Sequence, residues 1–204
     1  MADVLTVVFN IESEAYQAFS ELKAFKQDNH TQIAQIALVK NENGKITIKD
    51  SVDFDDTSRE YATIGGIVGG LIGILSGPIG VILGYGIGSL AGAASGSMTD
   101  ATDNSLIEEV TTKLLDGDVA VIALVHEEDE NILNHVFAPY KTNIMRWDAV
   151  ALAREVELAS QVQDELYDKV QEDMNERRVN HLKEQGNDIA EAIKAKFRRL
   201  RGKE

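Results

Sequence analysis

The chain has 204 residues, of which 44% are hydrophobic, so it is long enough for one folded domain with an additional segment. It contains no cysteine, which excludes disulfides and thiolate metal sites or nucleophiles. Its net charge of -14 argues against general binding to nucleic acid, because an acidic surface repels the phosphate backbone.

The first 50 residues alternate between strand and helix patterns. Short apolar runs indicate strands, and apolar residues at helical spacing indicate a helix between the first two of them. Asn43 and Gly44 separate the second and third runs, and this dipeptide readily takes the positive φ angles of a tight hairpin turn. We therefore predict strands at residues 4–9, 33–39 and 46–48 and a helix at residues 11–25.

The most unusual feature is an uncharged segment of 39 residues, Tyr61 to Thr99, which contains twelve of the 16 glycines. Most of these glycines recur every four residues, so in helices they would lie along one face. Glycine costs roughly 1 kcal/mol relative to alanine in a helix interior, so close packing against another helix must offset this cost. We predict helix packing or self-association through Gly65, Gly69, Gly73, Gly77, Gly80, Gly84, Gly88, Gly92 and Gly96.

The same segment is predicted to fold as two helical arms. Residues 57–60 fit a capping box that begins the first helix near Ser58, and the turn is predicted at Ser76, Gly77 and Pro78. Arms of about 18 and about 21 residues would be roughly 27 and 31 Å long, close to the roughly 30 Å core of a bilayer. Such a hairpin returns both ends to one side, and it suits either a membrane or a soluble assembly.

Strand and helix patterns resume after the glycine-rich segment. A helix opens with the acidic residues that follow the most apolar strand of the chain, and Pro139 ends it. We predict helices at residues 106–115 and 127–138 and strands at residues 119–125 and 143–147.

Each half of the chain thus shows a β-α-β pattern. Two such units suggest an α+β fold, a ferredoxin-like sandwich with helices on one face and the sheet on the other. Residues 1–56 and 100–148 would form this domain, and the glycine-zipper helical hairpin at residues 57–99 would interrupt it. A long C-terminal helical region follows at residues 149–204.

The C-terminal region has no strand pattern and no proline, and its apolar spacing predicts one or two long helices with a break at Gly186-Asn187. Its last eleven residues carry about +5, which leaves about -19 on the rest of the chain. This basic end would bind anionic lipid or form a solvated helix end that the helix dipole favours. The candidate lipid contacts are Lys194, Lys196, Arg198, Arg199 and Arg201.

No group of residues forms an active-site pattern. The four histidines are dispersed and lack the spacing of metal ligands, and no GxSxG nucleophile motif occurs. The glycine-rich segment lacks the lysine of a phosphate-binding loop, and its Ile, Val and Leu residues argue against a flexible linker. We therefore predict no enzyme activity, no metal, no cofactor and no nucleic-acid partner, and we identify no small-molecule substrate.

Three stretches resemble a family of uncharacterised bacterial predicted membrane proteins, a family with a domain of unknown function. They are the strand at residues 4–9, the sequence Tyr61-Ala-Thr-Ile-Gly-Gly-Ile-Val-Gly-Gly-Leu-Ile-Gly, and the acidic helix at residues 104–115. The resemblance covers about three quarters of the chain and does not include the long C-terminal helix. It implies an α+β domain interrupted by a glycine-rich apolar segment, and it implies no activity.

These features favour a non-enzymatic, membrane-associated or membrane-inserting protein whose hairpin mediates helix packing and self-association as a homo-oligomer. It would lie on the cytoplasmic side of the cell membrane, because the N-terminus does not read as a secretory signal, with an envelope or stress-related role. The acidic residues that flank the hairpin argue against insertion, since Lys and Arg usually hold the cytoplasmic ends of membrane helices. The alternative is a cytoplasmic structural homo-oligomer or filament whose hairpins pack across subunits.

Overall fold

The computed structural model describes residues 2–54, 65–77, 80 and 106–176. These residues form an α+β structure with five strands and five helices, which confirms the predicted class. In chain order the elements are β1 (Ala2–Phe9), α1 (Glu12–Lys23), β2 (Thr31–Glu42), β3 (Lys45–Asp53), α2 (Gly65–Ser76), α4 (Leu106–Lys113), β4 (Val119–Glu127), α5 (Glu130–Phe137), β5 (Thr142–Asp148) and α6 (Ala149–Glu176).

The five strands form one sheet in the order β3-β2-β4-β1-β5, and every neighbouring pair is antiparallel. Strand β4 lies in the centre, and eight of its nine residues are buried. The apolar run that predicted the strongest strand is therefore the middle of the core, since a strand covered on both faces needs apolar residues at every position.

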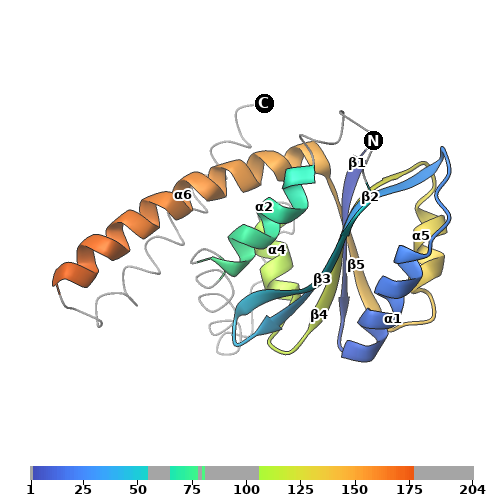
Figure 1. The fold of residues 1–204 in the computed structure, drawn as a ribbon, viewed down its shortest axis with the longest axis horizontal. Coiled ribbons are helices and arrows are strands. Elements are labelled where there is room, and N and C mark those ends of the chain that lie inside the picture. Colours follow the sequence, from blue (N-terminus) through green and yellow to red (C-terminus); the bar gives the residue numbers. More distant parts are fainter. Residues whose placement is uncertain (1, 55–64, 78–79, 81–105, 177–204) are drawn as a thin grey trace, which may run out of the picture.

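Helices cover both faces of the sheet (Figure 1). Helices α1 and α5 pack on the face that includes Leu5, Val7 and Phe9. Helices α2, α4 and α6 pack on the other face, which includes Val4 and Val8. The helices of the two predicted β-α-β units, α1 and α5, share one face, and the structure differs from the prediction in that further helices cover the other face. Cover on both faces is needed because β1 is apolar on both sides, and both sides must be removed from water.

The β2–β3 hairpin turns at the predicted dipeptide, with φ of 56° at Asn43 and 75° at Gly44. Both angles fall in the left-handed region that a tight two-residue turn needs. Strand β3 extends to Asp53 and is longer than the predicted residues 46–48. Its second half was missed because an edge strand with polar residues lacks a continuous apolar run.

Helix α6 follows β5 without a loop and contains 28 residues. The Asp148 carboxylate caps its start by accepting a hydrogen bond from the Ala151 N–H at 2.8 Å. Leu152 and Ala159 are fully buried, so the first half of the helix belongs to the core. The helix, about 42 Å long at 1.5 Å per residue, extends past the sheet (Figure 1).

Candidate helix-packing site

The described structure includes part of the predicted glycine zipper. Helix α2 lies within the residues predicted for the first arm, and it ends at Ser76, the first residue of the predicted turn. The Gly77 N–H continues the last turn by donating to the Ile74 carbonyl oxygen at 3.1 Å. The remaining predicted residues lie outside the part of the chain that the structure describes: Pro78, Gly84, Gly88, Gly92, Gly96, Lys194, Lys196, Arg198, Arg199 and Arg201.

The apolar face of α2 is buried against the sheet. Leu71 is 0% exposed and Leu75 is 1% exposed, and both belong to the same cluster as Val4 and Val8 of β1. The Ser76 hydroxyl also donates to the Ile46 carbonyl oxygen of β3 at 2.7 Å. Helix α2 is therefore an integral part of the α+β core. The buried residues of α2 are Ile67, Val68, Leu71, Ile72, Ile74 and Leu75.

A second face of α2 contacts α6 through glycine. A Cβ atom at Gly70 would lie 2.8 Å from Val156 Cγ1, and a Cβ atom at Gly77 would collide with the Gln163 side chain. Real Cβ atoms do not approach other atoms this closely, so a larger residue at position 70 would require Val156 to shift, whereas at position 77 the flexible end of the Gln163 side chain could move aside. The two glycines, seven residues apart, allow the two helices to approach closely.

The third face of α2 carries Gly66, Gly69 and Gly73, and we call it the outer glycine face. All three residues are exposed. A Cβ atom at any of them would have no described atom within 4 Å outside α2 itself. Each glycine costs roughly 1 kcal/mol relative to alanine in a helix interior. No contact among the described residues requires glycine at these three positions, so the described structure does not explain why they are glycine.

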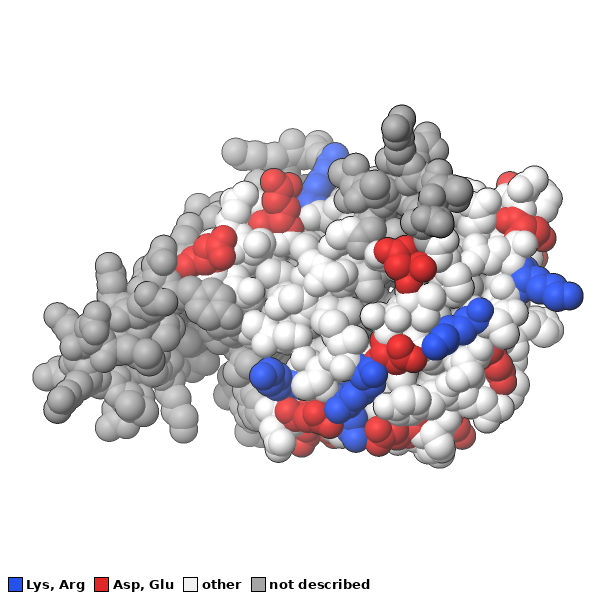
Figure 2. Space-filling model, viewed as in Figure 1, with Lys and Arg blue, Asp and Glu red and all other residues white. Residues whose placement is uncertain are grey.

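The surface near α2 carries charged side chains of both signs (Figure 2). Figure 2 shows acidic and basic side chains of both signs around an uncharged area at the position of α2. Helix α2 itself contains no charged residue. The outer glycine face is therefore uncharged, and an uncharged surface can contact another apolar element without desolvating a charge.

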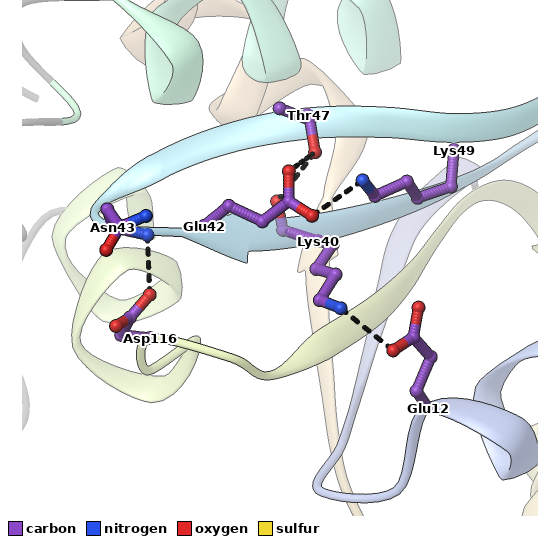
Figure 3. A network of polar contacts seen from close by, with 7 residues as sticks. All are labelled: Glu12, Lys40, Glu42, Asn43, Thr47, Lys49 and Asp116. Atoms are coloured by element: carbon purple, nitrogen blue, oxygen red, sulfur yellow. Dashed lines mark hydrogen bonds and ion pairs between the residues drawn. The ribbon is translucent and has the colours of Figure 1, made fainter.

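The end of the sheet nearest the hairpin turn is held by polar contacts (Figure 3). The Asn43 N–H donates to Asp116 Oδ1 at 2.6 Å, which ties the β2–β3 turn to the turn after α4. Hydrogen bonds from Lys49 and then Thr47 lower the pKa of Glu42. These contacts fix the two turns relative to each other, beside the C-terminal end of α2.

The opposite end of the sheet contains most of the remaining charge pairs. The Arg146 Nε donates to Glu127 Oε1 at 2.7 Å, and the Glu127 side chain is only 1% exposed. His30 Nδ1 lies 2.7 Å from Glu128 Oε2, and this hydrogen bond raises the pKa of the His30 imidazole. Burial raises the pKa of Asp3, and the nearby Asp148 carboxylate adds to the shift.

These charge pairs do not assemble into a recognisable reactive centre. Among residues 2–54, 65–77, 80 and 106–176, no group of three or more acidic or histidine side chains is placed to hold a metal ion. None of the helices in these ranges combines the length and the apolar character needed to cross a bilayer. The helix-packing surface of α2 is therefore the candidate site that the geometry defines best.

Fold and site together define a class: an α+β protein in which a glycine-rich helix covers one face of the sheet. The chain belongs to the family described as Protein of unknown function (DUF1269), whose model matches residues 62–163. The expected membership of a family of unknown function is thereby confirmed. The matched range includes α2 and reaches into α6, whereas β1, on which the resemblance partly rests, lies outside it. No curated protein and no solved structure matches the chain.

The contact between α2 and α6 was missed by sequence reasoning. The predicted stripe of glycines at four-residue spacing joins Gly69, Gly73 and Gly77, but only Gly77 of these three meets α6. The informative spacing is instead the seven residues between Gly70 and Gly77, which return to nearly the same side of a helix. A search for this spacing, paired with Val156 and Gln163 on α6, could have found the contact.

Proposed function

We propose that the chain is a non-enzymatic protein that self-associates through the outer glycine face of α2. One observation supports this function above all: three exposed glycines at Gly66, Gly69 and Gly73 lie on one side of a helix whose other sides are occupied. Exposed glycines weaken a helix in water, but they allow a second helix to approach until backbone and Cα–H groups make contact.

The proposed fold is ferredoxin-like with a glycine-zipper hairpin inserted after β3. Its core would be the two units β1-α1-β2 and β4-α5-β5, and the strand order β2-β4-β1-β5 with α1 and α5 on one face supports this assignment. Strand β3 would be an additional edge strand. The hairpin's second arm would be residues 80–99, which continue the four-residue glycine spacing beyond α2.

The proposed partner is a second copy of this chain. Residues 80–99 have the composition that fits the outer glycine face, because small residues on both surfaces permit the closest approach. Two copies could exchange this arm by domain swapping. The contact between the copies would then be the same one that closes a hairpin within one chain, so a homo-oligomer needs no new type of contact.

Membrane association is the second candidate, because 39 consecutive residues are uncharged and the C-terminus is basic. Helix α2 is a poor anchor for it. Its move into lipid would keep its own side chains out of water but would expose the apolar residues of the sheet that it covers, such as Val4, Val8 and Val39. Typical domains have only about 5–15 kcal/mol of stability in total. Lipid contact would therefore involve residues 81–99 and the basic C-terminal residues, on the cytoplasmic side of the membrane.

Sedimentation velocity of the full chain tests the proposal. We expect a defined oligomer for the unmodified chain and a folded monomer for the double substitution Gly69→Leu and Gly73→Leu, because leucine side chains would hold the partner helix away. Ser13→Leu, on the exposed side of α1, is the matched control and should keep the oligomer. A folded double variant that still assembles like the unmodified chain would contradict self-association through this face.

Fractionation of cells separates the two candidates. Recovery of the chain in the supernatant after a carbonate wash, as a defined oligomer and without detergent, favours self-association alone. A chain that stays with the membrane after the wash and enters solution only with detergent favours the membrane candidate instead.

A further inference from the structure

A cavity of about 150 Å³ lies on the α2 side of the sheet, at the end that contains the β2–β3 turn. It is bounded by the last residues of α2, by the last turn of α4 and the residues after it, and by the hairpin. Its lining residues are Asn41, Gly44, Ile46, Leu75, Gly80, Thr111, Leu114, Leu115 and Asp116.

The polar side chains of this cavity offer oxygen atoms that accept hydrogen bonds. Asn41 is only 9% exposed, and its amide nitrogen donates to the Leu114 carbonyl oxygen at 2.8 Å. This bond orients the amide, and the Asn41 Oδ1 atom has no partner among the described residues. An unpaired buried acceptor is costly, so a donor that reaches it gains a hydrogen bond at a desolvated site.

Two further oxygen groups line the same space. The Thr111 hydroxyl proton is already used, since Oγ1 donates to the Glu108 carbonyl oxygen at 2.8 Å, so toward a ligand this hydroxyl can only accept. The Asp116 carboxylate uses Oδ1 to accept from the Asn43 N–H, which holds the group at the rim (Figure 3). Together with Asn41 Oδ1 these groups place three side-chain oxygen acceptors along the cavity lining.

The electrostatic environment also favours a cation. Helices α2 and α4 both end at this cavity, and the C-terminal end of a helix carries a partial negative charge. The Asp116 carboxylate adds a full negative charge. The nearby Lys45 and Lys113 do not line the cavity. Ile46, Leu75 and Leu114 supply apolar walls that a hydrocarbon chain can contact.

We propose that this cavity is a binding site for a protonated primary alkylamine. An ammonium group donates hydrogen bonds and accepts none, and Asn41, Thr111 and Asp116 supply oxygen acceptors to the cavity lining. A cavity of this volume holds a molecule about the size of benzene, so an alkyl chain of four or five carbons fits against the apolar walls. The site goes beyond self-association and does not depend on it, because none of its residues belongs to the outer glycine face.

Titration of the unmodified, isotope-labelled chain with n-butylamine, followed by amide NMR, tests the site. We expect saturable shifts centred on Asn41, Gly44, Thr111 and Leu114, with an affinity in the millimolar range for so small a ligand. Two compounds with the same number of carbon atoms serve as controls. n-Butanol has no charge, and butyrate has a negative charge in place of the positive one. The proposal predicts at least about tenfold weaker binding for butanol and none for butyrate. Equal shifts with butylamine and butanol, or no saturable shifts with butylamine, would overturn it.

A charge-removing pair of variants sharpens the test. Asp116→Asn keeps an oxygen for the Asn43 N–H and should weaken butylamine binding about five- to tenfold. Asp164→Asn removes one charge from an exposed position on α6 and should leave the affinity unchanged. Equal affinity in both variants would contradict the role of the cavity charge. The same NMR titration with a peptide of residues 194–204, which contains lysines, compares the affinity for a lysine side chain with the affinity for n-butylamine.

Discussion

Two sets of glycines on one helix meet different surroundings. At Gly70 and Gly77 the neighbouring helix α6 is so near that a methyl group would collide with it. At Gly66, Gly69 and Gly73 the same helix faces open space in the described structure. Glycine at the first set is explained by the fold, whereas glycine at the second set points to a contact beyond the described residues. A repeated residue type along one helix thus serves two separate surfaces.

The largest effect is expected from the apolar face of α2, which packs against the sheet. Leu71→Ala should lower the free energy of unfolding by about 2–5 kcal/mol, because the lost side chain is fully buried and leaves a cavity. Urea denaturation measures this change. Ile48→Ala, at a residue that is 56% exposed, is the control and should stay within about 0.5 kcal/mol of the unmodified chain. A Leu71 variant as stable as this control would show that α2 is not part of the core.

Gly70→Leu and Gly69→Leu compare the two glycine faces directly. The leucine at position 70 should collide with Val156 and lower the stability of the chain by about 1–3 kcal/mol. At concentrations where both chains are monomeric, the leucine at position 69 should keep or raise the stability, because it meets no described side chain and favours the helix. Thermal and urea unfolding of both variants provide the measurement. Similar losses at the two positions would remove the distinction between the faces.

Alanine substitutions give a smaller effect of opposite sign on the two faces. Gly69→Ala should raise the free energy of unfolding by about 0.5–1 kcal/mol through helix propensity. Gly70→Ala should lower it, and Val156→Ala should relieve part of this loss because it removes the Cγ1 atom 2.8 Å away. A double-mutant cycle with Gly70→Ala and Val156→Ala measures the coupling. Additive effects would mean that α6 does not contact α2 here.

The smallest effect is expected at the His30–Glu128 pair, which lies at the other end of the sheet from the C-terminal end of α2. The hydrogen bond to Glu128 raises the pKa of His30, so protonated His30 favours the folded state. This contribution is present below the ordinary histidine pKa of about 6.5 and is lost as the pH rises through the raised value. In an NMR titration of the ring, Glu128→Gln should lower the His30 pKa. An unchanged pKa would argue against the pair in solution.

The sequence predicted local elements well where one residue type determines the backbone. Asn43 and Gly44 placed the hairpin turn because few residues accept positive φ, and the continuous apolar run of residues 119–125 identified the central strand. Strand β3 was predicted too short, because its exposed half depends on pairing with β2 and not on its own hydrophobicity.

The position of α2 could not be predicted from its own residues. A helix of glycine and aliphatic residues fits lipid, another helix or a sheet equally well, because each environment accepts an uncharged surface. The deciding information is in β1, where Val4 and Val8 point to one face and Leu5 and Val7 to the other, so both faces are apolar and require cover. The candidate cavity was also beyond reach, since it joins residues from three separate turns.

Disulfide cross-linking measures the central claim most directly, because the chain has no cysteine of its own. Gly69→Cys places one thiol on the outer glycine face, and Ser13→Cys places one on the exposed side of α1. A disulfide requires two Cα atoms within about 7 Å, so it reports direct contact between copies. Self-association through this face predicts rapid formation of a covalent dimer with Gly69→Cys and slow formation with Ser13→Cys. Equal, slow cross-linking of the two folded variants would contradict it.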